Sequence, residues 1–343
     1  MNEDEGFRYY EIMEDSTDKE GVMSEKMTHN SEFDDILKEQ KKLQRKEKFK
    51  NDFPLYLMML PGMIYLICNN YLPMFGILLA FKRINYAKGI FKSPWVGLQN
   101  FEYLFKTKDA LVMIRNTLAY NAVWILMDLV IAVFIALCMN EIAQRKIAKV
   151  IQPIICFPSM VSAVILSFLV YAFLSQSYGY LNTVFFKDNP VAWYTTARYW
   201  PFILTIVHIW QSAGQSSVIY MASIGGIDKS LYESARIDGA TKMEQIRYIT
   251  LPLLKPMIIM MLLLSIGRIF NSDFGLFYQV PLGNGMLYET TQTIDTFVYR
   301  ALIINNNVGQ SSAASVFQAV IGFFLVMFSN LLVRKINPEN SLF

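Results

Sequence analysis

The sequence contains the stretch VIQPIICFPSMVSAVILSFLVYAFL at residues 150–174, which has no Asp, Glu, Lys or Arg. About 20 apolar residues are enough for a helix to cross the hydrocarbon core of a bilayer. Three further runs without a charged side chain lie at residues 53–81, 199–227 and 301–333, and each is longer than that minimum. The chain is therefore expected to be a membrane protein that crosses the bilayer several times.

The overall composition agrees with this expectation. Apolar residues make up 54% of the 343 residues, and charged residues make up 17%. Soluble domains carry about 25% charged residues, so a soluble enzyme is excluded. The three cysteines, Cys68, Cys138 and Cys156, lie inside apolar runs and are expected to act as small hydrophobic side chains. Their spacing matches neither a disulfide framework nor a metal site.

Charge divides the chain at about residue 52. Residues 1–52 hold 15 acidic and 10 basic side chains, whereas residues 53–343 hold 13 acidic and 21 basic ones. The first 35 residues are polar and acidic and are expected to be disordered. Seven basic side chains between residues 38 and 50 directly precede the first apolar run, which predicts a cytoplasmic N-terminus. The basic excess lies around the apolar runs and indicates membrane topology rather than nucleic-acid binding.

We predict a cytoplasmic tail over residues 1–52 and an all-α, polytopic transmembrane domain over residues 53–340. The six predicted spans cover residues 54–80, 116–139, 150–174, 201–224, 253–276 and 312–333. An even number of spans returns the C-terminus to the cytoplasm. One loop disagrees, because residues 82–115, which this topology places outside, hold seven basic side chains against two acidic ones. The basic tail and the later loops outweigh that disagreement.

The segment between the fourth and fifth predicted spans, residues 228–252, has strong local helix signals. Ser230 with Glu233 and Thr241 with Glu244 each have the spacing of a capping box, which opens a helix. Gly239 lies between the two boxes, where a helix end commonly needs a left-handed residue. The pattern predicts two short cytoplasmic helices joined by a glycine turn. Such a protrusion suits docking to another protein, although a well-capped loop without a partner gives the same pattern.

The same segment carries a motif. The spacing Glu233-x-Ala235-x-x-x-Gly239, then Ile249-x-Leu251-Pro252, resembles the EAA motif of ABC-importer permeases, with Ser234 where the family usually has Ala. Further matching stretches resemble the maltose/glycerol-phosphate type of sugar permease, and within it the polysaccharide or complex-oligosaccharide permeases of lipoprotein-dependent importers. These stretches are Gly97-Leu-Gln-Asn-Phe-Glu-Tyr-Leu-Phe105, Phe157-Pro158, Gly179-Tyr-Leu-Asn182 and His208-Ile-Trp210. The resemblance covers residues 53–340.

The resemblance implies a type I ABC-importer permease fold with a cytoplasmic coupling helix, in the plasma membrane of a bacterium. It implies a heterodimer with a second permease, two cytoplasmic ATPase subunits and an extracellular solute-binding lipoprotein that delivers an oligosaccharide. ATP and Mg²⁺ then belong to the ATPases, and this chain binds no cofactor and is no enzyme. The residues expected to couple it to the ATPases are Ser230, Glu233, Ala235, Asp238, Gly239, Ile249, Leu251 and Pro252.

The chain has no G-x-x-x-x-G-K-[ST] loop for binding ATP phosphates, since Gly225-Gly-Ile-Asp-Lys-Ser lacks the spacing. Energy for transport must therefore come from a partner. An ion-driven secondary transporter and a membrane-embedded carbohydrate enzyme are the alternative functions. The chain has two histidines, His29 and His208, and no H-E-x-x-H motif, so metal catalysis has little support.

Polar side chains in spans tend to face a cavity or another helix. His208, Gln211 and Gln215 share one helical face beside Trp210, and we expect these four residues to contact a sugar. Hydrogen bonding between helices is the alternative. By resemblance, Arg268, Asn271 and Asp273, with Ser272 between them, line the sugar site from the fifth span.

Apart from Lys255 at the cytoplasmic end of the fifth span, Arg268 is the one basic residue inside a predicted span, so it needs an acceptor. Asp128 or the partner permease could form a structural salt bridge with it. A carboxylate on an acidic sugar is the functional alternative, since the guanidinium fork suits planar anions. For Asp128 itself, an inter-helix partner is expected rather than ligand contact. Tyr171 and Gln318 are weaker candidates for the sugar site.

Overall fold

The structure is a computed structural model that describes residues 42, 48–49, 52–142 and 147–336. The predicted disordered segment and most of the basic segment lie outside the described residues. The chain divides into two compact units, Met1–Phe75 and Gly76–Phe343. Throughout the described residues the fold is helical, and one isolated antiparallel bridge joins Lys82 to Trp95.

In the first unit the chain is helical from residue 52, with a π-helical turn η1 (Ile67–Tyr71) followed by α2 (Leu72–Met74). This stretch belongs to a continuous apolar helix, Asp52–Phe81, that is long enough to cross a membrane. Its side chains are apolar on every side, as expected of a helix that faces lipid rather than one core.

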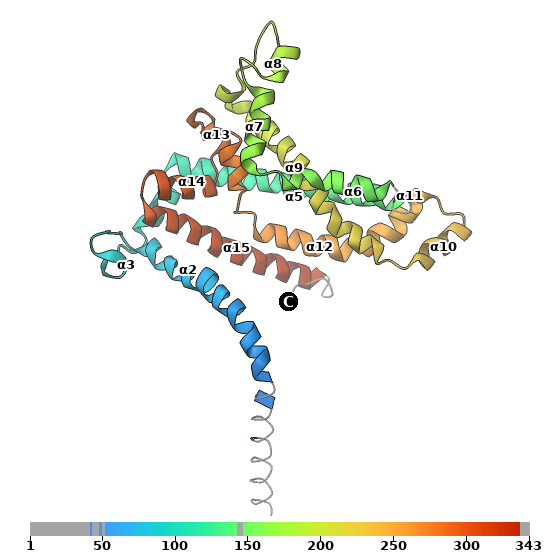
Figure 1. Ribbon diagram of the computed structural model, residues 1–343, viewed down its shortest axis with the longest axis horizontal. Helices are drawn as coiled ribbons and strands as arrows, with labels where there is room; N and C mark the ends of the chain where they lie inside the picture. Colours follow the sequence, from blue (N-terminus) through green and yellow to red (C-terminus); the bar gives the residue numbers. More distant parts are fainter. Residues whose placement is uncertain (1–41, 43–47, 50–51, 143–146, 337–343) are drawn as a thin grey trace, which may run out of the picture. The chain divides into compact units, whose positions relative to one another are not determined.

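The second unit is built around four long helices (Figure 1). They are α5 (Lys108–Ile142), α9 (Trp200–Gly225), α12 (Leu251–Gly267) and α15 (Val308–Ile336). Helix α5 packs along α9, and α12 packs along α15. With 35 residues, α5 is about 52 Å long, more than the thickness of a hydrocarbon core. It therefore connects the two ends of this unit.

Short helices join these long ones. Before α5 lie η2 (Phe75–Phe81), α3 (Gly89–Lys92), η3 (Gln99–Phe101) and α4 (Glu102–Lys106). Before α9 lie α6 (Ala148–Cys156), η4 (Phe157–Met160), α7 (Ala163–Leu174), α8 (Tyr180–Val184), η5 (Trp193–Thr195) and η6 (Ala197–Tyr199). Between α9 and α12 lie α10 (Lys229–Ile237), α11 (Lys242–Gln245) and the π-helix η7 (Ile246–Thr250). Before α15 lie η8 (Gly275–Gln279), η9 (Gly285–Leu287), α13 (Tyr288–Thr291), α14 (Ile294–Tyr299) and η10 (Arg300–Ile304).

The predicted span over residues 150–174 is not one continuous helix. The chain bends by 93° between Val150–Met160 and Ala163–Leu174. Pro158 lies at the start of the 3-10 turn η4, where proline cannot continue the preceding hydrogen-bond ladder. Ser162 then caps a new helix, because its side chain accepts a hydrogen bond from the Ile165 amide. The two halves are a broken span or a re-entrant loop.

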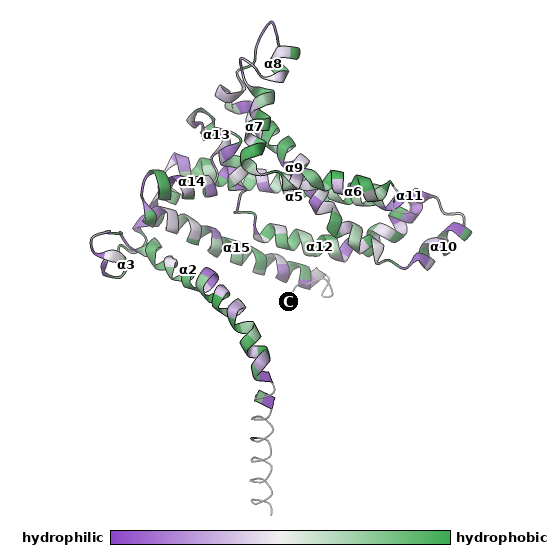
Figure 2. Cartoon of the chain, viewed as in Figure 1, coloured by the Kyte–Doolittle hydropathy of each residue, from purple (hydrophilic) through white to green (hydrophobic). Residues whose placement is uncertain are grey.

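The predicted number of six spans is not confirmed by length and hydropathy. Four described helices are long and apolar enough to cross a membrane, and the bent pair raises the number to five. Helix α9 matches the predicted fourth span in position and length, but it is not among these helices. It carries His208, Gln211, Gln215 and several serines, which lower its hydropathy (Figure 2).

The predicted fifth span, 253–276, has the wrong bounds. The helix begins earlier, because α11, η7 and α12 form one continuous helix, Lys242–Gly267. It ends nine residues before the predicted end, because Arg268 and Ile269 leave the helix in a turn. The last helical turn lies close to α15, where a Cβ on Gly267 would overlap the side chain of Val326.

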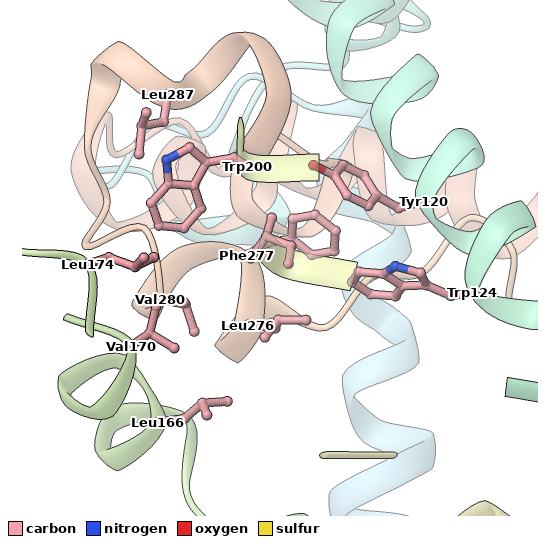
Figure 3. Close-up of a cluster of buried hydrophobic side chains, with 11 residues drawn as sticks. Tyr120, Trp124, Leu166, Val170, Leu174, Trp200, Leu276, Phe277, Val280 and Leu287 are labelled. Carbon is pink, nitrogen blue, oxygen red and sulfur yellow. The ribbon is translucent and has the colours of Figure 1, made fainter. Parts of the chain in front are cut away.

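Three clusters of buried apolar side chains hold the second unit together. The first contains Tyr120 and Trp124 of α5 and the fully buried Trp200 of α9, around Phe277 (Figure 3). A second cluster joins α4, α5, α14 and α15 around Phe297. The third joins α5, α9 and α12. Residues from α7 and η8 also contribute to the first cluster. The cluster therefore holds both the helix that follows the 93° bend and the helix that follows the end of α12.

Gly214 allows α9 and α6 to approach each other. A Cβ at this position would overlap the backbone carbonyl of Ile155, which cannot rotate away. We expect Gly214→Ala to lower the free energy of unfolding by about 1–3 kcal/mol, the usual cost of overpacking. Thermal unfolding of the purified protein in detergent measures the effect. Gly225→Ala in the same helix is the control, because its Cβ meets nothing within 4 Å. Equal stability of the two variants would contradict this packing.

Candidate functional site

The polar face of α9 is anchored to α5. The Asp128 carboxylate is 2.9 Å from Nε2 of His208 and accepts a 2.8 Å hydrogen bond from the Ser212 hydroxyl. The His208 ring also stacks on Trp124, with ring centroids 3.8 Å apart and an interplanar angle of 8°. The interpretation of Asp128 as an inter-helix partner is confirmed. Both of its oxygens are occupied by α9, so it does not pair with Arg268.

The four sugar-contact candidates on α9 do not converge on one cavity. Nε2 of Gln211 donates a 3.1 Å hydrogen bond to the carbonyl of Val161, at the bend between η4 and α7. Trp210 and Gln215 are exposed on the surface of the isolated chain. Helix–helix hydrogen bonding, the alternative stated above, therefore accounts for His208 and Gln211, whereas Trp210 and Gln215 stay free for a ligand or partner.

A small cavity lies between α5, α9 and α12. Its polar lining comes from Asp128, Ser216 and Ser265, and its volume is about 100 Å³. Ligand pockets usually measure about 300–1,000 Å³. This cavity has room for a few water molecules and is too small for an oligosaccharide within this chain alone.

The candidates from the predicted fifth span lie beyond the end of α12. Arg268 is exposed and follows Gly267 as the C-cap of α12, at the end of the apolar helix rather than inside it. Asn271 and Asp273 are also exposed. The Asp273 carboxylate accepts a 3.0 Å hydrogen bond from the Leu276 amide and thereby starts η8. All three residues belong to one irregular segment, 268–273.

Side chains from three helices hold this irregular segment in place. From α5, the Asn121 amide donates 2.8 Å hydrogen bonds to the carbonyls of Ile269 and Asn271. From α15, Gln318 donates a 2.7 Å hydrogen bond to the Phe270 carbonyl. Gln318 is buried, so this structural contact accounts for a residue that was a weaker sugar candidate.

The third helix contributes Asp295, which sequence reasoning missed. Oδ2 of Asp295 accepts hydrogen bonds from the Ser272 amide at 2.6 Å, the Ser272 hydroxyl at 2.8 Å and Gln318 at 3.2 Å. The topology placed Asp295 in an external loop, which gave no reason to single it out. The available signal was local: Thr293 and Thr296 form a capping box that begins α14 and fixes the position of Asp295.

At the other end of α5, the segment between α9 and α12 folds as two capped helices. The first capping prediction is wrong, because Asp228 rather than Ser230 is the N-cap of α10, with a 2.9 Å hydrogen bond from the Ser230 amide. Hydrogen bonds from the Ser230 amide and hydroxyl hold the pKa of Asp228 below its ordinary value. The carboxylate therefore stays charged at the positive end of the helix dipole.

The second capping prediction is confirmed. Thr241 and Glu244 form a reciprocal capping box at the start of α11. Gly239 has a φ of +83°, the left-handed conformation expected of the glycine turn. The remaining coupling candidates are distributed along the segment: Glu233 and Ala235 lie in α10, Asp238 ends it, Ile249 lies in η7, and Leu251 and Pro252 begin α12.

One contact ties this segment to α5, and a second joins two helices within the segment. Lys242 forms a 2.7 Å ion pair with Glu141 near the end of α5. The hydroxyls of Tyr232 and Thr250 are 2.9 Å apart and join α10 to η7. A cavity of about 430 Å³ opens between the ends of α5 and α9 and the helices α10 and α11. Its lining includes Glu233, so one residue of the motif faces a space large enough for a protein side chain.

Comparison with known proteins places the chain in a family. The model of the family "Binding-protein-dependent transport system inner membrane component" matches residues 128–339. The chain belongs to this family. The match includes the polar face of α9, the segment 228–252 for which a coupling role is predicted (the coupling segment), and the irregular segment 268–273.

Curated relatives extend the comparison to most of the chain. It is 34% identical over 306 residues to "Polygalacturonan/rhamnogalacturonan transport system permease protein YteP" of Bacillus subtilis (strain 168), covering 89% of this chain and 95% of YteP. It is 29% identical over 292 residues to "Protein LplB" of the same organism, covering 84% and 91%. The resemblance to sugar permeases stated from the sequence is confirmed. Neither an ion-driven transporter nor a membrane enzyme is favoured.

Two solved structures have a similar fold. One is a crystal structure of a bacterial ABC transporter involved in the import of the acidic polysaccharide alginate, with a TM-score of 0.76 and 32% identity over 85% of this chain and 98% of the matched chain. The other is a bacterial alginate ABC transporter in complex with an alginate pentasaccharide-bound periplasmic protein, with a TM-score of 0.75. The permease is therefore a transport component, and its helical fold is that of ABC-importer permeases.

Asp295 provides a test of how segment 268–273 is held. We expect Asp295→Ala to lower the free energy of unfolding by about 1–3 kcal/mol, because Ser272 and Gln318 lose their shared acceptor. Amide hydrogen exchange of residues 269–273 should become faster. Exposed Asp188, in the loop after α8, provides the control variant Asp188→Ala, which is expected to change neither measurement. Unchanged exchange in Asp295→Ala would show that Asn121 and Gln318 are sufficient.

Proposed function

We propose that this permease is the translocation subunit of an ATP-driven importer and moves an oligosaccharide across the membrane by alternating access. The observation that carries the proposal is the coupling segment, in which α10 and the Gly239 turn lead into the continuous helix Lys242–Gly267. A force applied to α10 therefore reaches the irregular segment 268–273 through one unbroken helix. The names of the relatives support sugar import.

The contacts of the segment explain how movement is transmitted. The Lys242–Glu141 ion pair links the start of this continuous helix to α5, and Tyr232 links α10 to it. When α10 moves with an ATPase, α5 and α12 are displaced together at this end. Rigid-body displacement of packed helices opens one side of a transport path and closes the other.

The assembly that we propose contains this permease, a second permease, two ATPase subunits and an extracellular solute-binding lipoprotein. ATP and Mg²⁺ are bound by the ATPases. The N- and C-termini and the coupling segment are cytoplasmic, whereas segment 268–273 faces outward. The solved relative that is bound to a pentasaccharide-loaded periplasmic protein supports delivery by such a protein.

For the substrate we propose an acidic oligosaccharide. Polygalacturonan is named for one relative and alginate for the solved transporters, and both are polymers of uronic acids. Trp210 and Gln215 on α9, and the exposed side chains of Arg268, Asn271 and Asp273, are free to contact it when the partner permease completes the path. His208 and Gln211 orient α9 against its neighbours.

Gly239 tests the coupling. Valine is β-branched and poorly tolerated at positive φ, so Gly239→Val is expected to strain the turn by about 1–3 kcal/mol. Transport and substrate-stimulated ATP hydrolysis by the assembled importer should then fall together by at least about fivefold, while the binding protein still binds substrate. Gly239→Asn is the matched control, because Asn enters this conformation more readily. Full transport by the valine variant at equal expression would reject the coupling role.

The orientation can be tested by labelling. In a variant without the three native cysteines, a cysteine at exposed Lys187 should react with a membrane-impermeant thiol reagent from outside intact cells. A cysteine at Ile237, which is 87% exposed at the end of α10, should react only after the membrane is opened. The reverse pattern would overturn the cytoplasmic assignment of the coupling segment.

A further inference from the structure

An arginine and four aromatic rings form a cluster beyond segment 268–273. The Arg300 guanidinium lies over the Tyr288 ring, 4.0 Å from its centroid. Phe274 and Tyr278 stack with centroids 5.1 Å apart and an interplanar angle of 14°, and Tyr299 lies 4.7 Å and 4.9 Å from these two rings. All five side chains are half-buried, so they are fixed by packing yet accessible.

The guanidinium in this cluster has no counter-ion in the part of the chain that the structure describes. Among the described residues, no carboxylate lies within ion-pair distance of Arg300 and no acceptor is hydrogen-bonded to it. Burial raises the pKa of Tyr278 above its ordinary value, and the Arg300 charge opposes that shift, so the charge acts inside the cluster. Arg115 differs, because it donates hydrogen bonds to Asn116 and to the Glu289 carbonyl. Arg300 therefore keeps its donors available.

The cluster lies at the end of α5 opposite the coupling segment (Figure 1). Arg115, near the start of α5, contacts the carbonyl of Glu289 beside Tyr288, whereas Glu141, near its end, pairs with Lys242. These contacts are separated by most of a 35-residue helix. In the proposed orientation the cluster is therefore on the outer side, where a delivered substrate arrives.

The basic loop that conflicts with the topology rule lies beside this cluster. Tyr103 stacks on Phe297 with centroids 4.9 Å apart, and the Tyr86 hydroxyl is 3.5 Å from the Asn306 carbonyl, just after η10. Three lysines of this loop are exposed and make no ion pair with a described residue: Lys88, Lys92 and Lys108. A basic surface around a binding site concentrates an anionic ligand and raises its association rate.

We propose that Arg300 and the rings of Phe274, Tyr278, Tyr288 and Tyr299 form an outer subsite for one carboxylate-bearing sugar unit of the substrate. The guanidinium fork accommodates the planar carboxylate, and the fixed rings offer apolar faces to the C–H faces of the sugar. The surrounding lysines attract the anionic chain. This subsite rests on the proposed function and adds to it the position at which the acidic group is recognised.

The test measures saccharide binding to the complete importer, free of nucleotide, in phosphatidylcholine nanodiscs that offer no anionic lipid. The probes are fluorescent pentagalacturonate and its methyl ester, which lacks the charges. Arg300→Gln should weaken binding of the acid at least about tenfold, and Arg300→Lys should weaken it less, because the charge remains but the fork is lost. Arg198→Gln is the matched control, since exposed Arg198 also lies over a tyrosine, 5.0 Å from the ring centroid of Tyr199.

Three results would overturn the subsite: equal affinity of the wild-type importer for the acid and the ester, wild-type affinity in Arg300→Gln, or an equal loss in Arg198→Gln. If Arg300→Gln does not assemble, as judged by size-exclusion chromatography, Arg300→Lys decides by the same comparison. Uptake of pentagalacturonate by the wild-type importer with its loaded binding protein is measured in parallel. Absence of uptake there contradicts the proposed function, whereas uptake that is unchanged in Arg300→Gln contradicts the subsite alone.

Discussion

The end of α12 is the constraint on which the packing around segment 268–273 depends. A helix that stops at Gly267 leaves backbone groups without intrahelical partners, so they need hydrogen bonds from other parts of the chain. Asn121 and Gln318 donate to three of the carbonyls that follow, and Asp295 accepts from the Ser272 amide. Because these side chains come from three helices, the break is held only when those helices are packed. Helix α12 and its neighbours are therefore positioned together.

The other end of the same continuous helix is also fixed by a neighbouring helix. Lys242 begins the continuous helix that ends at Gly267, and the Glu141 ion pair joins this start to α5. Helix α5 in turn contributes Asn121, which donates a hydrogen bond to the Ile269 carbonyl, and Asp128, which contacts His208 of α9. Helix α5 and the continuous helix Lys242–Gly267 thus both run from segment 228–252 to the irregular segment 268–273. Beyond the Gly239 turn, no loop interrupts the helix between α11 and the irregular segment.

Local chemistry could be predicted from the sequence, whereas tertiary geometry could not. The Thr241 capping box and the Gly239 turn follow from residues close in sequence, and both are confirmed. The alternative N-cap at Asp228 was missed because two polar residues compete for one helix end. The bend after Pro158 and the end of α12 depend on Ser162, Asn121 and Asp295, and the last two lie far along the chain from the break that they hold. No local pattern reports such contacts.

Helix α9 shows how polar side chains lower the hydropathy of a long, well-packed helix. It fails the test for an apolar span, yet Trp200 and Leu204 are fully buried and the helix packs along α5. Its polar groups divide into two sets: His208 and Gln211 have partners within the chain, and Trp210 and Gln215 are exposed. An amide facing lipid is costly, since lipid offers no hydrogen bond. The exposed set therefore suits the proposed contact with a substrate path or with the second permease.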